Sequence, residues 1–426
     1  MSLGLRLRAK LPAPCPDPKT LLNRIAQWLR ETYPQLSPKI RLGEMDECPT
    51  VFCKLHPAAE DFEISLLDAE HLVVSANTTT VGPGYHIFLT SLFKNCAANF
   101  DFSWEIPGDS EDDFGDETEF FFSGDEKRLR EEMTQWLKAL ANLFFDGTFG
   151  PDYKNIALCM PMNPQFDAGQ AAITQIGPRD RDWLRKTAES GTNGTDFFAW
   201  WDSGMNAGYY LGRALAQMWS DVRWRPPAND TEKAVLADVA GSLQSAYRLN
   251  PTLPYPWTEW LEILDLLESG DEEKSWLIPR ATRPSTIGYR RKNVWAALPG
   301  QWTINVPGSF SDFESDEDGA VCAFDPPREI WFTAYQSQAP LSPSAWATEK
   351  QEIRAADPEF LIDRGSSISQ ASISRKGSDA EEAYSILQAS VVCPDKRCIC
   401  TIVFPGESEQ DWALDTWKSL RPPTVE

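Results

Sequence analysis

Apolar side chains recur at helical spacing in several parts of the chain. After Asp17-Pro18, apolar residues return every three or four positions, which is the spacing of one helix face. They are Leu21, Leu22, Ile25, Trp28 and Leu29. The same spacing predicts helices over residues 85–97, 125–145, 179–188, 196–223, 231–249, 257–267, 342–356 and 408–419.

Short alternating or apolar runs between turn residues predict the strands. In the first part of the chain they cover residues 51–54, 62–67, 72–76, 156–160 and 171–176, and a strand, an acidic loop and a second strand are expected over 101–126. In the last third they cover 287–289, 302–306, 320–324, 330–335, 360–363, 366–375, 383–392 and 397–404. In the last of these, the alternation places Cys398 and Cys400 on one buried face.

The order of these elements predicts an α+β protein with two domains, because 426 residues exceed one ordinary hydrophobic core. The first domain is expected over residues 1–270, rich in strands up to 178 and helical from 179. A polar linker follows at 271–285. Residues 286–426 are then expected to form an antiparallel sheet flanked by helices.

Residues 286–422 resemble the Mog1/PsbP-like fold. The resemblance rests on Pro299-Gly300-Gln301-Trp302 leading to Val306-Pro307, on a hairpin across Asp325-Pro326, on the middle helix, and on a closing hairpin with a final helix. It is a pattern of elements without a diagnostic motif, and it covers about a third of the chain. The fold hosts unrelated binding and adaptor roles, so the resemblance implies a noncatalytic module. Residues 1–270 resemble no family that we recognise.

The charge balance narrows the classes of partner. The chain has 63 acidic and 40 basic residues, for a net charge of −23. Nucleic acids and anionic membrane surfaces attract basic proteins, so neither is expected as a partner. A basic protein is the partner that the charge permits. No apolar run is long enough to span a bilayer, and the start of the chain lacks an apolar signal segment, so a cytoplasmic protein is expected. The nine cysteines are an odd number spread over a long chain, which predicts reduced thiols.

The acidic residues are densest between residues 101 and 126, where eleven acids occur without a Lys or Arg. A surface for docking a basic partner would use Asp112, Asp113, Asp116 and Glu117. A solvated loop is the simpler interpretation of the same residues. A calcium loop would need carboxylates at alternate positions around a central glycine, and the spacing about Gly115 does not fit.

Histidine chemistry is limited to His56, His71 and His86. His56 and His71 are expected at the surface or at strand ends. His86 follows Gly82-Pro83-Gly84 at a predicted helix start, where backbone amides could hold an anion beside the imidazole. A tight turn with His86 packed in the first helical turn explains the same pattern. The known nucleophile, zinc, phosphate and dinucleotide motifs are absent, so no catalytic residue, metal or cofactor is predicted.

Aromatic residues are densest between 197 and 224. Trp201 and Trp224 are the candidates for a binding surface, because Trp, Tyr and Arg dominate binding hot spots. Helical spacing makes most of their neighbours core residues.

The leading hypothesis is therefore a noncatalytic protein-binding or adaptor protein, of which an immunity protein acting on a basic toxin is one form. One alternative is an enzyme of unfamiliar type with a site near His86 and the neighbouring carboxylates. The other is a helical scaffold acting through residues 179–270. The sequence leaves the oligomeric state open.

Overall fold

The computed structural model describes residues 3–34, 39–106, 114–146, 155–158, 160, 162–191, 194–316, 319–337, 339–376 and 383–423. The chain divides into two compact units. Unit 1 comprises residues 1–160, 166–222 and 234–288, and unit 2 comprises 161–165, 223–233 and 289–426.

Unit 1 begins with a sheet whose path is β2-β3-β4-β5-β1-β6, with β7 paired to β1. The strands are β1 (Gly4–Lys10), β2 (Lys39–Met45), β3 (Cys48–Lys54), β4 (Phe62–Leu66), β5 (His71–Asn77), β6 (Ser103–Trp104) and β7 (Gly115–Asp116). Every pair in this sheet is antiparallel. Alternation fixes which face is apolar: in β1, Leu5, Leu7 and Ala9 are buried and the residues between them are not.

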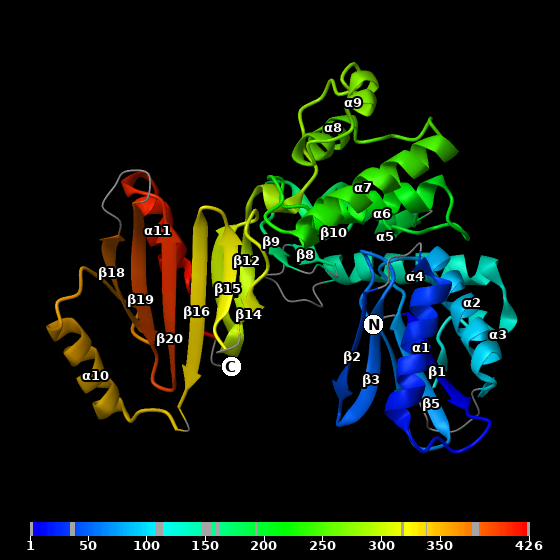
Figure 1. The fold of residues 1–426 in the computed structure, drawn as a ribbon, viewed down its shortest axis with the longest axis horizontal. Coiled ribbons are helices and arrows are strands. Elements are labelled where there is room, and N and C mark those ends of the chain that lie inside the picture. The colour runs from blue at the N-terminus through cyan, green and yellow to red at the C-terminus, as the bar shows by residue number, and fades with distance from the viewer. Residues whose placement is uncertain are drawn as a thin grey trace. The chain divides into compact units, whose positions relative to one another are not determined.

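Helices α1 (Pro18–Thr32) and α2 (Pro83–Phe100) bury that apolar face (Figure 1). Their inward residues join the strand residues in one core, to which α1 contributes Leu22, Ile25, Ala26 and Leu29. Gly82 precedes α2 with φ 113°, and a Cβ there would lie 2.6 Å from the Cβ of Phe198. Only glycine fits this close approach, which joins α2 to the segment around residue 198.

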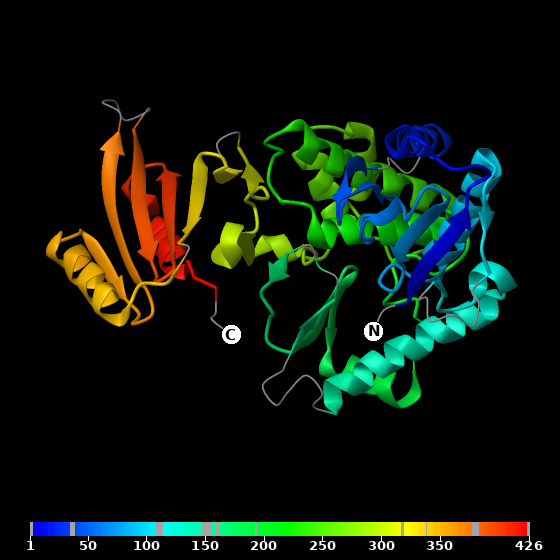
Figure 2. The ribbon, with the colours of Figure 1, turned by 90° about the horizontal axis from the view of Figure 1, so that it is seen from below.

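The rest of unit 1 is mostly helical. Figure 2 shows α4 as one long uninterrupted helix. The helices are α3 (Phe120–Ser123), α4 (Glu126–Phe145), α5 (Arg181–Ser190), α6 (Ala207–Ser220), α7 (Asp230–Leu249, of which residues 234–249 belong to unit 1), α8 (Trp257–Leu266) and α9 (Asp271–Leu277). A small sheet of order β11-β10-β8 accompanies them, formed by β8 (Ile156–Ala157), β10 (Gln170–Thr174) and β11 (Gly177–Asp180).

Unit 2 contains a seven-stranded antiparallel sheet of order β14-β15-β16-β20-β19-β18-β17. Its strands are β14 (Glu314–Ser315), β15 (Val321–Asp325), β16 (Arg328–Gln336), β17 (Phe360–Asp363), β18 (Ile368–Lys376), β19 (Tyr384–Val392) and β20 (Lys396–Phe404). Helix α11 (Gln410–Ser419) and the hairpin of β12 (Asn293–Leu298) and β13 (Trp302–Pro307) share a core with one face of this sheet, and β12 also pairs with β9 (Asn163–Pro164). Helix α10 (Pro343–Ala355) packs through Ile353 against Ile368 and Val392.

The α+β fold class is confirmed, with the antiparallel sheet and its helices in the C-terminal third. Cys398 and Cys400 lie buried on one face of β20, as predicted. The helix predicted over 196–223 is wrong in its first half, because Gly204 has φ 82° and Asn206 caps α6 with its side chain. Phe120-Phe121-Phe122 form a helical turn and not a strand.

Several strands were not predicted, among them β1, β2, β11 and β12, and β2 is an edge of its sheet. The strand predicted over 287–289 is wrong, because Tyr289 begins a 3-10 turn there. Residues 271–277, within the segment expected to be a linker, form α9. Among the described residues, no helix combines the length and apolar character needed to cross a membrane.

Candidate functional site

The free edge of β2 is the most distinctive feature of unit 1. Strand β2 ends the path of its sheet and, in the described part of the chain, pairs only with β3. An edge strand carries a row of backbone N–H and C=O groups that can pair with another chain. The position of these groups follows from the turn that joins the two strands.

A two-residue turn joins β2 to β3. Asp46 has φ 50° and Glu47 has φ 65°, so both central residues are in the left-handed region, as in a type I′ turn. Such a turn makes the flanking pair, Met45 with Cys48, a hydrogen-bonded pair. Hydrogen-bonded and non-hydrogen-bonded pairs alternate along an antiparallel ladder.

Three residues of β2 therefore point their backbone groups away from β3. The non-hydrogen-bonded pairs are Glu44 with Pro49, Leu42 with Val51 and Ile40 with Cys53. Pro49 supports this register, because proline has no N–H to donate. The outward N–H and C=O groups of β2 belong to Ile40, Leu42 and Glu44.

One of these outward groups already has a partner. The Arg30 guanidinium on α1 donates to the carbonyl oxygen of Ile40 at 3.3 Å, which agrees with the outward direction of that carbonyl. The backbone groups of Leu42 and Glu44 have no hydrogen-bond partner among the described residues. The unpaired part of the edge is thus centred on Leu42.

Helix α1 forms a groove beside this edge. The Asp17 carboxylate caps the helix by accepting from the Thr20 N–H at 3.2 Å and from the Thr20 hydroxyl at 2.7 Å. Pro18 stands at the first helical position, where its missing N–H costs nothing. This start directs Leu22 into the core below β3 and leaves Lys19 and Asn23 at the rim.

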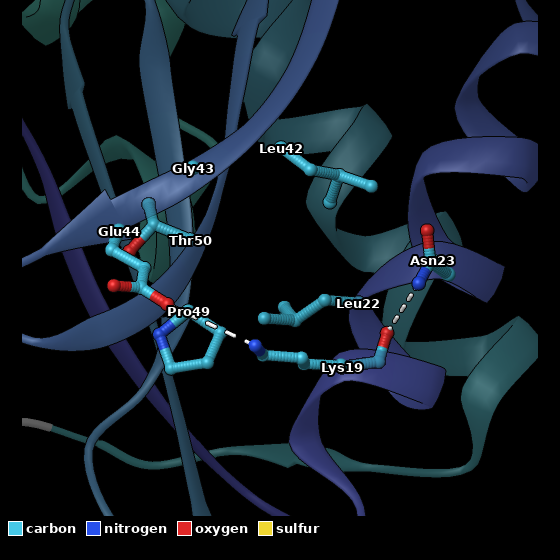
Figure 3. A pocket seen from close by; sticks show the side chains of 8 residues that line it. All are labelled: Lys19, Leu22, Asn23, Leu42, Gly43, Glu44, Pro49 and Thr50. Atoms are coloured by element: carbon cyan, nitrogen blue, oxygen red, sulfur yellow. Dashed lines mark hydrogen bonds and ion pairs between the residues drawn. The ribbon is translucent and has the colours of Figure 1, made fainter.

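The groove has a volume of about 480 Å³ and is open to solvent. Figure 3 shows α1 on one side of it and the β2–β3 hairpin on the other. The lining residues are Lys19, Leu22, Asn23, Leu42, Gly43, Glu44, Pro49 and Thr50. Leu42 is 49% exposed although it is apolar, so its side chain is available to a bound group.

Charges line the groove and its edge. The Lys19 Nζ lies 3.8 Å from the Glu44 Oε1, and both side chains are largely exposed, so this ion pair contributes little to stability. On the other face of β2, the Arg41 guanidinium lies 3.8 Å from the centre of the Phe52 ring and 3.1 Å from the Asp61 carboxylate. The strand is thus basic at its start and acidic towards the turn.

His86 is in the interior of unit 1. Its side chain is completely buried at the start of α2, and both ring nitrogens have partners. The Nδ1 atom lies 2.9 Å from the Thr78 hydroxyl, and Nε2 lies 3.1 Å from the Asp116 carboxylate. In this structure the imidazole has no exposed surface, and it links α2 to the segment that contains Asp116.

Asp116 is fully satisfied in the same network. Its carboxylate accepts from the backbone N–H groups of Thr118 at 2.8 Å and Phe121 at 2.6 Å, and from the Thr118 hydroxyl at 2.7 Å. Burial alone would raise the pKa of Asp116, but hydrogen bonding and charge from His86, with the bonds from Thr118 and Phe121, hold it below its ordinary value. The contacts make this carboxylate a structural group.

The lowered pKa of Asp116 gives a pH dependence with a definite sign. Its stabilisation is complete above the unfolded pKa of about 3.9 and is lost as pH falls through the lower folded value. We therefore expect the stability advantage of the natural chain over Asp116→Asn to shrink as pH falls below about 4. Urea unfolding at pH 5 and pH 3 measures this, and an advantage that is larger at pH 3 than at pH 5 would contradict it.

The other acidic residues predicted for a docking surface do not form one cluster in the described structure. Asp112 and Asp113 lie outside the described residues. Glu117 is exposed, and its carboxylate accepts from the Gly4 N–H at 2.9 Å, which ties it to the start of β1. In the part of the chain that the structure describes, no three His, Cys, Asp or Glu side chains gather as metal ligands would.

The two predicted tryptophans lie in different units. Trp201, in unit 1, stacks on Phe198 with ring centres 5.7 Å apart and is partly buried. Trp224, in unit 2, has φ 57°, and the Arg291 guanidinium lies 3.6 Å from its ring centre. Neither ring stands free of the surrounding side chains.

His56 is not at the surface as expected. It is buried among Tyr85, Trp200 and Tyr209, and its Nδ1 accepts from the Ala58 N–H at 3.1 Å. Burial, with added repulsion from Arg213 and Lys54, holds the pKa of His56 well below its ordinary value. The ring is neutral because a proton there would be costly to bury. His71 does begin β5, where it contacts Asp68.

The helices α7 to α9 carry a cluster of aromatic rings. Tyr247 stacks on Trp276 with centres 5.0 Å apart, and Trp257 stacks on the buried Trp260 at 5.9 Å. Leu249 and Ile278, at the ends of α7 and α9, are exposed. The rings cover one another, so this region is a packed core of the helical part with a few exposed apolar side chains.

The comparisons with known proteins show no family for this chain. No protein-family model matches it, and no characterised protein matches its sequence. A solved protein of Bacteroides thetaiotaomicron matches part of the structure, with 18% identity and a TM-score of 0.25. The match covers 32% of this chain and 49% of the other, so the chain spans about half the length of that protein.

Proposed function

We propose that this protein is a noncatalytic binding protein that recognises an extended segment of a partner protein by adding it to β2 as a further strand. The observation that carries the proposal is the unpaired N–H and C=O groups of Leu42 and Glu44, placed beside an open groove. In strand addition, main-chain hydrogen bonds supply affinity and neighbouring pockets select side chains.

The partner is expected to be a basic protein, because the net charge of −23 speeds encounter with basic surfaces and repels acidic ones. An immunity protein that neutralises a basic toxin remains one concrete form of the proposal. We infer also that unit 2 has the Mog1/PsbP-like arrangement, supported by its antiparallel sheet with helices and by the residues of the sequence resemblance.

A peptide selection tests this function. Random seven-residue peptides displayed on phage would be selected on the full chain and counter-selected on the Leu42→Pro variant. The proposal predicts peptides that bind the natural chain and not the variant. Proline at position 42 removes one outward N–H without removing a bond to β3, and such edge positions tolerate it. Peptides that bind both chains equally, or no enrichment at all, would rule the proposal out.

A further inference from the structure

The charges around β2 indicate which segment would occupy its edge. Lys39 lies directly opposite Lys54 in the β2–β3 ladder, and like charges in this position destabilise a sheet. No ion pair or hydrogen bond to either side chain occurs among the described residues. An acidic residue of an added strand, opposite Lys39 on its free side, would relieve this repulsion.

The acidic end of β2 should pair with a basic residue of an added strand. Among the described residues, the Glu44 side chain contacts one opposite charge, Lys19, over a long and exposed distance, and Asp46 and Glu47 follow it in the turn. Leu42, midway between Lys39 and Met45, presents an exposed apolar side chain at the groove. Along the free edge the order is therefore basic, apolar and acidic.

A second copy of the chain matches this order poorly. Antiparallel pairing of two β2 strands about Leu42 would place Ile40 opposite Glu44, Lys39 opposite Met45 and Arg41 opposite Gly43. No charge would then face its opposite directly. Two copies would also bring together net charges of −23 each, which oppose association.

We infer that the occupant of the β2 edge is an extended, antiparallel segment of a partner protein with acidic residues opposite Lys39 and Arg41, an apolar residue opposite Leu42 and a basic residue opposite Glu44. The inference rests on the proposed function and adds the chemistry of the ligand. We expect antiparallel pairing of the added strand because it is the more stable arrangement and the one found throughout this sheet. The charges of β2 then contribute mainly to specificity, since a charged edge strand disfavours pairing with segments whose charges do not match.

Two capped peptides test the inference on the full chain. The matched peptide, Lys-Lys-Thr-Ile-Glu-Thr-Glu, places its acids opposite Arg41 and Lys39 and its second lysine opposite Glu44. The reversed peptide, Glu-Glu-Thr-Ile-Lys-Thr-Lys, exchanges every charge. At low salt we expect the matched peptide to bind about tenfold tighter, or more, because several cross-strand pairs change sign together. The difference should shrink at 0.5 M salt.

A protein variant adds an independent readout. In Lys39→Glu the charge at the first residue of β2 is inverted on an exposed side chain. The difference in affinity between the matched and the reversed peptide should therefore decrease or change sign.

Equal binding of both peptides to the natural chain would overturn the charge order while leaving strand addition standing. Failure of both peptides to protect the Leu42 and Glu44 amides from exchange, at millimolar concentration, would overturn strand addition as well. A dimer in sedimentation that Leu42→Pro abolishes would assign the edge to a second copy.

Discussion

Replacing Asp116 with alanine is expected to lower the free energy of unfolding of unit 1 by about 3 to 5 kcal/mol, because several buried donors lose their acceptor at once. The side chain of Asp116 is completely buried, and its loss leaves the N–H groups of Thr118 and Phe121 without their acceptor. The His86 Nε2 would keep the Thr118 hydroxyl, at 3.3 Å, as its remaining partner among the described residues. Each orphaned buried donor adds its own desolvation cost.

Urea unfolding of Asp116→Ala at neutral pH measures this effect. The matched control is Glu131→Ala on α4, an exposed acid whose ion pair with Lys127 spans one helical turn at 3.7 Å. The control should stay within about 0.5 kcal/mol of the natural chain. If the two variants lose the same stability, the buried network around His86 does not hold unit 1 together as described.

Leu42→Pro should weaken binding of the matched peptide by about 2 kcal/mol or more, which is about 30-fold. The substitution removes the central outward N–H of the edge and leaves a carbonyl of the incoming strand unpaired. The fold should persist, because this N–H makes no bond to β3.

Two measurements separate this effect from unfolding or from loss of the Leu42 side chain. Far-UV circular dichroism should be unchanged in Leu42→Pro. The control variant Leu42→Ala keeps the backbone N–H and loses only the side chain at the groove, so it should retain more affinity than the proline variant. Equal losses in both variants would mean that the side chain, and not the backbone edge, binds the peptide.

Most helices and most strands of the C-terminal sheet could be predicted because their burial follows one simple period. Strand β17 is an example, since the prediction and the structure both give Phe360–Asp363. The helix over 196–223 was extended too far because aromatic residues are abundant on both sides of Gly204, whose positive φ ends the pattern. Apolar spacing alone does not show such a break.

The candidate site could not be predicted in the same way. Strand β2 has almost no buried residue, so the alternation that identifies half-buried strands is weak there. Its place at the edge depends on the pairing of distant strands, which no local signal contains. His86 and Asp116 were each recognised as candidates, but their pairing across thirty residues, and their burial, are properties of the folded chain.

Hydrogen exchange at single residues of β2 tests strand addition most directly. In the free protein we expect the amides of Leu42 and Glu44 to exchange rapidly, and those of Gly43 and Met45, which bond to β3, to exchange slowly. The matched peptide should slow exchange at Leu42 and Glu44 and leave Gly43 and Met45 nearly unchanged. Rapid exchange at all four positions, or no slowing at Leu42 and Glu44 when the peptide is bound, would contradict the proposal.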